Sequence, residues 1–593
     1  MAANPRIIVV GGGLAGLSAV IKIAEAGGTV DLFSVVPVKR SHSVCAQGGI
    51  NAAKNLKGEG DTTWHHFDDT IYGGDFLANQ TPVKGMCEAA PGIIDLLDRM
   101  GVPFNRTPEG LLDFRRFGGT LFNRTAFAGA TTGQQLLYAL DEQVRRYESE
   151  GKVRKFEAWE FLSAVLDNNQ VCRGICAMNL RTMEVVTFPA DAIIMATGGI
   201  GAIFGKSTNS VVCTGSASSA LYQQGAYYAN GELIQVHPTT IPGEDKLRLM
   251  SESARGEGGR VWVPRKAGDS RPWNSIPAAE RFYFLEEWYP KYGNLVPRDV
   301  ATRAIHRVVY ELGLGIDGQP MVYLDLTHID RATLNHKLEG ILEIYEKFVG
   351  DDPREVPMKI FPGMHYTMGG LWVDFNQMTN IPGIFAAGEA EYQYHGANRL
   401  GANSLLSCIY GGFVAGPKSI EYAKSLPAIQ GDGGHSAEKK RQEEINARLM
   451  QADGSENPFK IWRELGETMT KNVTVIRYNK AMQETDAKIY ELLERYRNIN
   501  LSDRSTWANS TFAFARQLYN MLHLSRVVTQ GAILRDESRG AHYKPDFPER
   551  DDERFLKTTK AHFAPDADEP RFEYEAVDTQ FIKPRPRRYD AAK

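Results

Sequence analysis

Cysteine is scarce and scattered in this chain of 593 residues. No two cysteines form a C-x-x-C pair, so the sequence predicts no disulfide frame and no zinc or iron–sulfur site of its own, as is typical of a reduced cytoplasmic protein. Cys172 and Cys176 are the closest pair, but they lie on an alternating segment that predicts a strand, where side chains four positions apart do not meet. The six cysteines are Cys45, Cys87, Cys172, Cys176, Cys213 and Cys408.

Long apolar runs and an excess of positive charge are also missing. No run approaches the roughly 18–20 apolar residues that span a bilayer, and the first residues lack the ordered regions of a signal peptide. We therefore expect a soluble chain that reaches a membrane only through partners. The 68 basic and 72 acidic residues give a net charge of −4. This balance argues against a nucleic-acid partner, which would call for a clustered basic surface.

The opening of the chain predicts a dinucleotide-binding βαβ unit. A β-branched run at 7–10 reads as a buried strand, 17–25 as a helix and 29–33 as a second strand. Between the first strand and the helix lies a G-x-G-x-x-G turn, in which glycine permits a tight turn and lets backbone N–H groups approach a pyrophosphate at the helix N-terminus. The glycines of the pattern are Gly11, Gly13 and Gly16.

One feature expected of such a unit is absent. An acidic residue often ends the second strand and holds the ribose, but here that position is near Ser34. The sequence therefore leaves open how the adenosine ribose is held.

Two later segments extend the same domain. Ala192–Ala196 reads as a strand followed by Thr197-Gly198-Gly199, and a strand near 381–387 ends in Gly388-Glu389. Both patterns are common in the FAD domains of two-dinucleotide flavoproteins. Because they lie far apart in the chain, we expect an insertion between them, from about Pro242 to Pro353.

Beyond residue 430 the pattern changes. Segments such as Ala481–Arg497 carry apolar residues at helical spacing, and the stretch after about Ala541 is rich in Pro, Asp, Glu and Arg. We expect an α/β fold. Its parts are a Rossmann-like FAD-binding domain in two pieces (1–241 and 355–430), an α+β capping domain between them (242–354), a helical domain (431–545) and an irregular C-terminal segment (546–593).

Residues 39–51, K-R-S-H-S-V-C-A-Q-G-G-I-N, resemble a signature of the succinate dehydrogenase and fumarate reductase flavoproteins. In that family the histidine of R-S-H is bonded covalently to the 8α carbon of FAD. The resemblance implies that His42 forms this bond, which raises the flavin potential enough for succinate to be a useful donor.

Further blocks that resemble the family occur in the family's order over roughly residues 5 to 550. In detail, the amino-acid sequence most resembles those of the menaquinone-linked enzymes of Gram-positive bacteria. Two departures stand out: Ser251 replaces the usual Thr, and Thr214-Gly215-Ser216 lacks the Asp that better-known relatives place after Thr-Gly. We expect small adjustments of binding from both. The other blocks are at 117–119, 237–239, 251–259, 298–300, 365–370 and 395–406.

A C4 dicarboxylate needs an anion clamp at each end, and arginine grips a carboxylate with a planar fork while histidine and hydroxyl groups add single bonds. The resemblance implies that His365 and Arg399 hold one carboxylate. It implies that His237, Ser251 and a backbone N–H near Gly48 hold the other. Phe117 and Gln47 are expected to line the pocket.

Oxidising succinate removes a hydride from one carbon and a proton from the next. The resemblance assigns the proton to Arg298, relayed through Glu252 and Arg255. Arginine is essentially never deprotonated when free. It therefore serves readily as the acid that protonates fumarate, whereas its role as a base for succinate needs a rare neutral form or concerted transfer. The sequence leaves this mechanism open.

The resemblance also supplies the cofactor contacts, with FAD linked through an 8α-histidyl bond and no metal. Besides His42, they are Gly11, Gly13, Gly16, Ser34, Ser41, Gly48, Gly49, Gly198, Glu389, Ser404 and Leu405.

Four other functions were weighed. L-aspartate oxidase shares most pocket blocks but holds FAD non-covalently, against which the R-S-H block argues. A soluble fumarate reductase would normally carry haem motifs, and no C-x-x-C-H is present. An RNA-modifying flavoprotein would need a basic surface. A non-catalytic FAD scaffold does not need a full set of dicarboxylate clamps.

The partners follow from the resemblance. A flavin reduced by two electrons must be reoxidised by carriers that accept one electron at a time. In the family this implies an iron–sulfur subunit and a haem b-containing membrane anchor. The chain would then be peripheral, on the cytoplasmic face of the bacterial plasma membrane. The direction is open between succinate oxidation and fumarate reduction, and the resemblance favours oxidation with menaquinone as acceptor.

Overall fold

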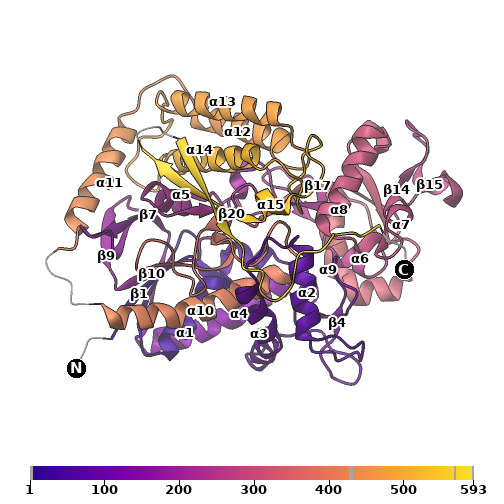
Figure 1. Ribbon diagram of the computed structural model, residues 1–593, viewed down its shortest axis with the longest axis horizontal. Helices are drawn as coiled ribbons and strands as arrows, with labels where there is room; N and C mark the ends of the chain where they lie inside the picture. The colour runs from indigo at the N-terminus through magenta and orange to yellow at the C-terminus, as the bar shows by residue number, and fades with distance from the viewer. Residues whose placement is uncertain (1–3, 427–431, 566–568, 591–593) are drawn as a thin grey trace.

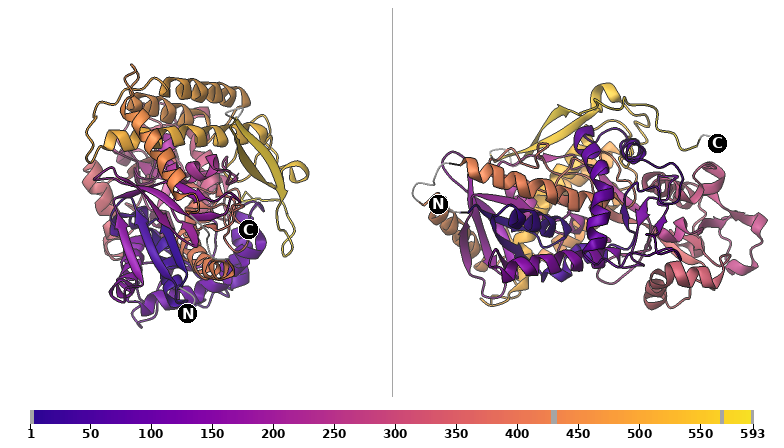
Figure 2. Two further views of the ribbon diagram at one scale, coloured as in Figure 1. Left: turned by 90° about the vertical axis from the view of Figure 1, so that its left-hand side faces the viewer. Right: turned by 90° about the horizontal axis from the view of Figure 1, so that it is seen from below.

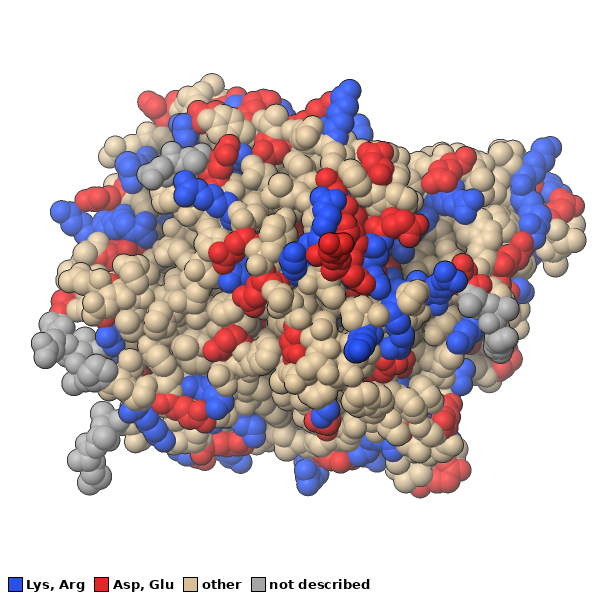
Figure 3. All heavy atoms as spheres, in the orientation of Figure 1, with Lys and Arg blue, Asp and Glu red and all other residues tan. Residues whose placement is uncertain are grey.

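The computed structural model describes residues 4–426, 432–565 and 569–590. Figure 1 shows a broad body that carries both the N-terminal and the helical elements, with a smaller lobe at its right-hand side formed by α6 to α9 and their strands. On the face seen in Figure 3, acidic and basic side chains are interspersed. None of the helices in the described residues is long and apolar enough to cross a membrane.

The body is built on a parallel sheet of five strands in the order β19-β10-β1-β2-β6. The expected βαβ unit forms its centre, with β1 at Arg6–Val10, α1 at Leu14–Glu25 and β2 at Thr29–Ser34. The two later strands predicted from the sequence join it as β10 (Ala192–Met195) and β19 (Ile384–Ala386). The remaining strand is β6 at Val153–Glu157.

Alternate residues of these strands enter two different cores, as the period of a strand requires. Ile7 and Val9 of β1 pack in one core with helices α1 and α10 (Asn403–Ser425). Ile8 and Val10 enter the other, beneath a sheet of β7 (Trp159–Leu166), β8 (Cys172–Asn179) and β9 (Val185–Pro189). Figure 2 shows this layering of helices and sheets from two further directions.

The smaller lobe contains a six-stranded sheet in the order β13-β12-β17-β16-β14-β15. Strands β12 (Ile234–Ile241) and β17 (Met358–Thr367) pair antiparallel with each other and connect the lobe to the body. A separate hydrophobic core holds the lobe together. Its other strands are β13 (Arg248–Leu249), β14 (Arg260–Pro264), β15 (Arg281–Phe282) and β16 (Val322–Asp325), and its helices are α6 (Ser253–Gly256), α7 (Phe284–Trp288), α8 (Arg298–His306) and α9 (Arg331–Val349).

Helices of the predicted helical domain cover the top and the left-hand side of the body in Figure 1. The predicted helix at 481–497 is α13, which runs over Asn479–Tyr496 and packs on α12 and α14. The others are α11 (His435–Met450), α12 (Pro458–Asn472) and α14 (Ser510–Leu534). The remaining helices of the body are α2 (Thr63–Gly73), α3 (Gln80–Arg99), α4 (Thr132–Ser149) and the short α5 (Ser216–Gln223).

The C-terminal segment is more regular than expected. It contains α15 (Asp552–Phe555) and a pair of antiparallel strands, β20 (Lys557–Ala564) and β21 (Glu569–Ala576). These complete a four-stranded sheet with β18 (Gly370–Leu371) and β11 (Tyr228–Ala229). The expectation of an irregular segment was wrong here because it rested on composition, whereas the alternation of charged and apolar residues along R-F-E-Y-E-A is a strand pattern. Beyond β21, residues 577–590 have no helix or strand.

Candidate functional site

The glycine turn after β1 forms one wall of a groove. Gly11 has φ +117°, and a Cβ there would lie 2.0 Å from the carbonyl oxygen of Ala196. A Cβ at Gly16 would lie 1.9 Å from the carbonyl oxygen of Gly11, so only glycine lets α1 approach the strand this closely. Helix α1 begins without a side-chain cap, which leaves its N-terminal N–H groups and its dipole available to an anion.

The groove encloses about 280 Å³. It runs from the glycine turn past the end of β2 to β7 and to the N-terminus of α5. Of the predicted cofactor residues it is lined by Gly11, Gly13, Ser34, Ser41, His42, Gly198 and Glu389. Gly16 does not line the groove but packs behind the turn.

A second, larger cavity of about 440 Å³ lies between the body and the smaller lobe. The two hollows share His42, Ser43, Glu389 and Cys408 in their walls, so they adjoin at His42. Every residue predicted to bind substrate lines this cavity, namely Gln47, Gly48, Phe117, His237, Ser251, His365 and Arg399. Glu252, Arg298, Gly49, Ser404 and Leu405 line it as well.

His237 presents a free hydrogen-bond donor to the cavity. Its Nδ1 accepts a hydrogen bond from the backbone N–H of Thr239, 3.2 Å away. Burial, together with nearby cations such as Arg298, holds the pKa of His237 well below its usual value, so the ring is neutral. A neutral imidazole that accepts at Nδ1 carries its proton on Nε2. That Nε2 is buried and has no partner among the described residues.

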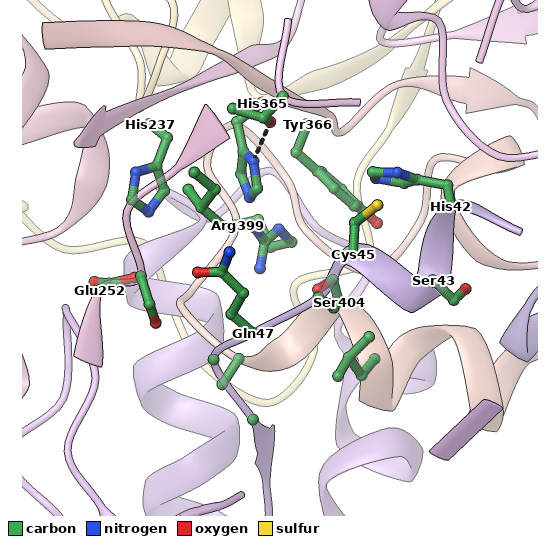
Figure 4. Close-up of a pocket in the computed structure, with 18 of the residues that line it drawn as sticks. His42, Ser43, Cys45, Gln47, His237, Glu252, His365, Tyr366, Arg399 and Ser404 are labelled. Atoms are coloured by element: carbon green, nitrogen blue, oxygen red, sulfur yellow. Dashed lines mark hydrogen bonds between the residues drawn. The ribbon is translucent and has the colours of Figure 1, made fainter. Parts of the chain in front are cut away.

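His365 and Arg399 lie beside His237, as Figure 4 shows. The ring centroids of His237 and His365 are 5.0 Å apart, and Nδ1 of His365 is 2.6 Å from the hydroxyl of Thr208. Arg399 is 2% exposed, and its guanidinium lies 4.5 Å from the ring centroid of Tyr366. Burial, followed by the charge of Arg298, lowers the pKa of Arg399 to about 9, which still leaves it a cation at neutral pH.

Arg298, Glu252 and Arg255 form a buried chain of charges. Nη2 of Arg298 lies 2.7 Å from Oε2 of Glu252, and Nη2 of Arg255 lies 3.3 Å from Oε1. Burial alone would raise the pKa of Glu252, but the two arginines hold it below its usual value, so Glu252 is ionised. Arg298 lines the cavity at the start of α8, whereas Arg255 lies behind Glu252 and donates to the backbone oxygen of Asn294.

His42 is oriented by a hydrogen bond at one ring nitrogen and a close contact at the other. Its Nδ1 accepts from the backbone N–H of Ser210 at 3.1 Å, and Asn209 Nδ2 lies 3.2 Å from Nε2. Burial, with a smaller effect of Lys246, lowers the pKa of His42 to about 4. The ring is therefore neutral and oriented at the point where the groove and the cavity meet.

Comparison with known proteins identifies this architecture. The FAD binding domain family matches residues 6–405, and the fumarate reductase flavoprotein C-terminal family matches residues 462–589. A succinate dehydrogenase flavoprotein subunit from Bacillus subtilis is 64% identical over 99% of both chains. This chain belongs to the succinate dehydrogenase and fumarate reductase flavoprotein family.

More distant members of the family agree over the whole length. The fumarate reductase flavoprotein subunit of Escherichia coli is 34% identical over 98% of this chain and 95% of its own. A solved structure of an E. coli quinol fumarate reductase variant superimposes with a TM-score of 0.91 and 32% identity, over 100% of both chains. A Mycobacterium smegmatis Sdh1 structure gives a TM-score of 0.81 at 28% identity, over 98% and 95% of the two chains.

The residues of this flavoprotein fit FAD. The groove has the glycine turn and uncapped helix that a pyrophosphate needs, and it opens at His42 into the cavity. At that junction Glu389 accepts from the backbone N–H of Thr367, and burial raises the pKa of Glu389 to about 7. Helix α10 also begins without a side-chain cap, after Ala402 at φ +63°, and its first turn carries Ser404 and Leu405 to the cavity. The positive end of the α10 dipole would favour the electron-rich edge of the flavin ring.

The residues that orient the site were not found from the sequence. Thr208 and Thr239 contact the two cavity histidines, and Asn209 and Ser210 hold His42. Only Thr239, in the H-P-T block, adjoins a predicted residue closely enough for the chain to have indicated it. Thr208, Asn209 and Ser210 come from a loop with no pattern of its own, which tertiary packing brings to the cavity.

Proposed function

We propose that this chain is the flavoprotein subunit of a membrane-associated succinate:quinone oxidoreductase, which oxidises succinate to fumarate and passes electrons to an iron–sulfur subunit. The observation that carries the proposal is that the groups inferred to bind the two carboxylates all line one cavity: Arg399 with His365, and His237 with Ser251. A substrate with a carboxylate at each end satisfies both sets. Holding both ends of succinate fixes its two methylenes, which is catalysis by positioning.

The buried histidines suit this task because their rings are neutral. Ordinary histidines would change charge near pH 6.5, but burial lowers the pKa of both His237 and His365 well below that value. Nε2–H of His237 has no other partner among the described residues, so a carboxylate placed there gives it a bond that it otherwise lacks. Arg399 supplies positive charge in a setting where burial strengthens the attraction.

FAD, when bound, accepts the hydride that leaves one methylene of succinate. We infer that Arg298 exchanges the proton of the other methylene, since among the cations that line the cavity it is the one paired with Glu252, which is in turn paired with Arg255. Glu252 is held by Arg298, by Arg255 and by the backbone N–H of Gly118 at 2.8 Å. The carboxylate of Glu252 is an acceptor next to Arg298, and it stabilises the positive charges of both Arg298 and Arg255.

We further propose that FAD is linked covalently through His42. The support is local: a neutral imidazole is nucleophilic, and the hydrogen bond from Ser210, with Asn209 in contact at Nε2, holds the ring at the junction between the groove and the cavity. The remaining assignments of cofactor contacts and domain boundaries made from the sequence stay part of this proposal.

The partners and location belong to the same proposal. An iron–sulfur subunit, a haem b-containing anchor and a place on the cytoplasmic face of the membrane suit a flavoprotein whose described residues contain no helix able to span a bilayer and no cluster of three or more potential metal ligands. Menaquinone is the proposed acceptor. Fumarate reduction by the same residues is the second candidate, supported by relatives named as fumarate reductases.

The test is a paired measurement on the purified complex. The protein is denatured in acid to ask whether flavin fluorescence stays with the polypeptide, and the native enzyme is assayed for dye reduction by succinate with and without malonate. We expect retained flavin and malonate-sensitive succinate oxidation, and His42→Ser should release the flavin on denaturation. Flavin that washes away, with activity on L-aspartate and none on succinate, would instead identify an L-aspartate oxidase.

A further inference from the structure

The groove lacks the acidic residue that often ends the second strand and holds the ribose, and it also lacks the Asp that better-known relatives carry after Thr-Gly. The position that ends β2 is Ser34, and the position after Thr214-Gly215 is Ser216. Both serines line the groove. An adenosine has hydroxyl and amino hydrogens that need acceptors, so the question is which group of this chain takes the place of the missing carboxylate.

Glu160 of β7 lies in the same groove with an unused oxygen. The residue is 4% exposed. Its Oε1 accepts a hydrogen bond from Nε2 of Gln517 at 2.9 Å, whereas its Oε2 is buried without a partner among the described residues. Leaving a buried carboxylate oxygen unpaired is costly, so the folded chain has an acceptor here that a ligand can satisfy. Burial raises the pKa of Glu160 to about 7.

Glu160 and Ser216 contact the same face of α14. Gln517, which bonds Glu160, and Asn520, whose Nδ2 donates to the hydroxyl of Ser216 at 2.8 Å, are three residues apart on this helix. Side chains at that spacing share a helix face. Glu160 on β7 therefore lies beside Ser216, the first residue of α5, where better-known relatives have Asp.

We propose that Glu160 accepts a hydrogen bond from an O–H or N–H of the adenosine half of the bound dinucleotide, in place of the acid absent at Ser34 and Ser216. The inference rests on the proposal that FAD occupies this groove. It assigns to Glu160 a role in holding the end of the cofactor farthest from His42, and none in the redox step.

Glu160 also lies near a partly buried cation. Arg516 lies close enough for the two charges to interact, and it donates to Gln442 at 2.5 Å. Removing the charge of Glu160 therefore disturbs Arg516 as well, which would lower stability whether or not adenosine is bound. The experiment must separate a loss of stability from a loss of adenosine recognition.

Discrimination between FAD and FMN makes this separation. In a His42→Ser background, where flavin binding is reversible, the dissociation constants of FAD and FMN are measured by flavin fluorescence with and without Glu160→Gln. The glutamine keeps the shape and the bond from Gln517 but lacks a charged acceptor. We expect FAD to bind about tenfold more weakly or worse while FMN binding changes little, because FMN has no adenosine. Glu184→Gln, an exposed charge removal, is the matched control and should change neither.

Equal weakening of both flavins would overturn the proposal, since it would show that Glu160 acts only through Arg516 and the fold. Unchanged binding of both flavins would overturn it as well. FAD binding by the His42→Ser parent is the separate check on the proposed function: if the parent binds no FAD, the function itself fails. An FAD analogue with hypoxanthine in place of adenine then distinguishes the donors. If the analogue binds more weakly than FAD to the protein that retains Glu160, but as well as FAD to the Glu160→Gln form, then Glu160 accepts from the adenine amino group. If the analogue and FAD bind equally well to the protein that retains Glu160, then Glu160 accepts from the ribose.

Discussion

Arg587, close to the end of the described chain, forms a buried ion pair with Asp299 of α8. Nη1 of Arg587 lies 2.6 Å from Oδ2 of Asp299, and Nη2 lies 3.0 Å from Oδ1. Burial alone would raise the pKa of Asp299, but Arg587 and Arg303 hold it at about 2. Asp299 directly follows Arg298, so the C-terminal residues hold the helix that begins with the proposed acid.

Replacing Arg587 with alanine should therefore affect both stability and turnover. The side chains of Arg587 and Asp299 are 7% and 0% exposed, and breaking a buried pair costs about 3 kcal/mol. We expect lower thermal stability and a lower kcat, because Arg298 loses its support. Arg585→Ala is the control, since its pair with Asp68 is 43% and 30% exposed and is worth less than about 1 kcal/mol. Equal effects of the two variants would show that the tail acts only as a surface strap.

Arg298→Ala should keep FAD and malonate binding and lose turnover in both directions. The anion-binding groups His237, His365 and Arg399 remain in place, while the group proposed to move the proton is gone. Because Glu252 would keep Arg255 as a partner, the site should not collapse. Flavin content, malonate affinity, succinate oxidation and fumarate reduction are measured on one preparation. Substantial turnover in either direction would remove Arg298 from the mechanism.

His237→Ala should weaken dicarboxylate binding by about tenfold to a hundredfold, as expected for loss of a hydrogen bond to a charged group. Thr239→Val makes a sharp control. The hydroxyl of Thr239 also lies 3.2 Å from Nδ1 of His237, but it donates to the backbone oxygen of Met250. The backbone N–H is therefore the donor that fixes the tautomer, and loss of the hydroxyl should change malonate inhibition only slightly. If the valine variant is as weak as the alanine variant, then the hydroxyl, and not the backbone, sets the orientation of the ring.

His66 should make the fold sensitive to acid. It is fully buried, its Nε2 lies 3.0 Å from Oδ1 of Asn403, and burial lowers its pKa to about 3. Below pH 6.5 the unfolded histidine takes up a proton that the folded one does not, so stability falls as the pH drops from 6.5 towards 3, by about 1.4 kcal/mol per pH unit. In His66→Gln the loss of stability between pH 7 and pH 5, measured by urea unfolding, should be smaller than in the parent. An unchanged difference would contradict a neutral buried ring.

Gly11→Ala should abolish flavin binding. The new Cβ would meet a backbone oxygen at 2.0 Å, and the residue has φ +117°. Gly27→Ala separates space from backbone conformation, because Gly27 has φ +85° with nothing within 4 Å of a Cβ. That control should cost about 1–2 kcal/mol of stability and leave flavin content unchanged. Normal flavin content in Gly11→Ala would mean that the turn is free to rearrange.

The sequence predicted best where local pattern and tertiary role coincide. The βαβ unit was placed within a few residues because β-branched strands, a glycine turn and an apolar helix are all local signals. The predicted substrate residues do gather around one cavity, but this grouping came from resemblance to a family: His237, Arg298 and Arg399 are far apart in the chain, and no periodicity joins them. Their individual roles stay predictions.

The sequence did not indicate which distant residues of the chain contact one another. Nothing local indicates that Ser210 donates to His42 or that Arg587 reaches Asp299, since both contacts depend on how separate segments pack. The strands of the C-terminal segment were missed because composition was weighed above alternation. The groove lacks an acid at Ser34, as the sequence indicated, and only the fold brings Glu160 to that region.

The ribbon of β12 and β17 joins the clamp residues that come from the lobe to those that come from the body. His237 and His365 lie on these two strands, which are the paired connections between the lobe and the body, and Arg399 belongs to the body. Ser251, Glu252 and Arg298 belong to the lobe beyond the ribbon. Arg298 is nevertheless tied to the ribbon, because its Nη1 donates to Oε1 of Gln235 on β12 at 3.0 Å. The same pair of strands therefore fixes the histidines of the clamp and the proton-transfer group relative to one another.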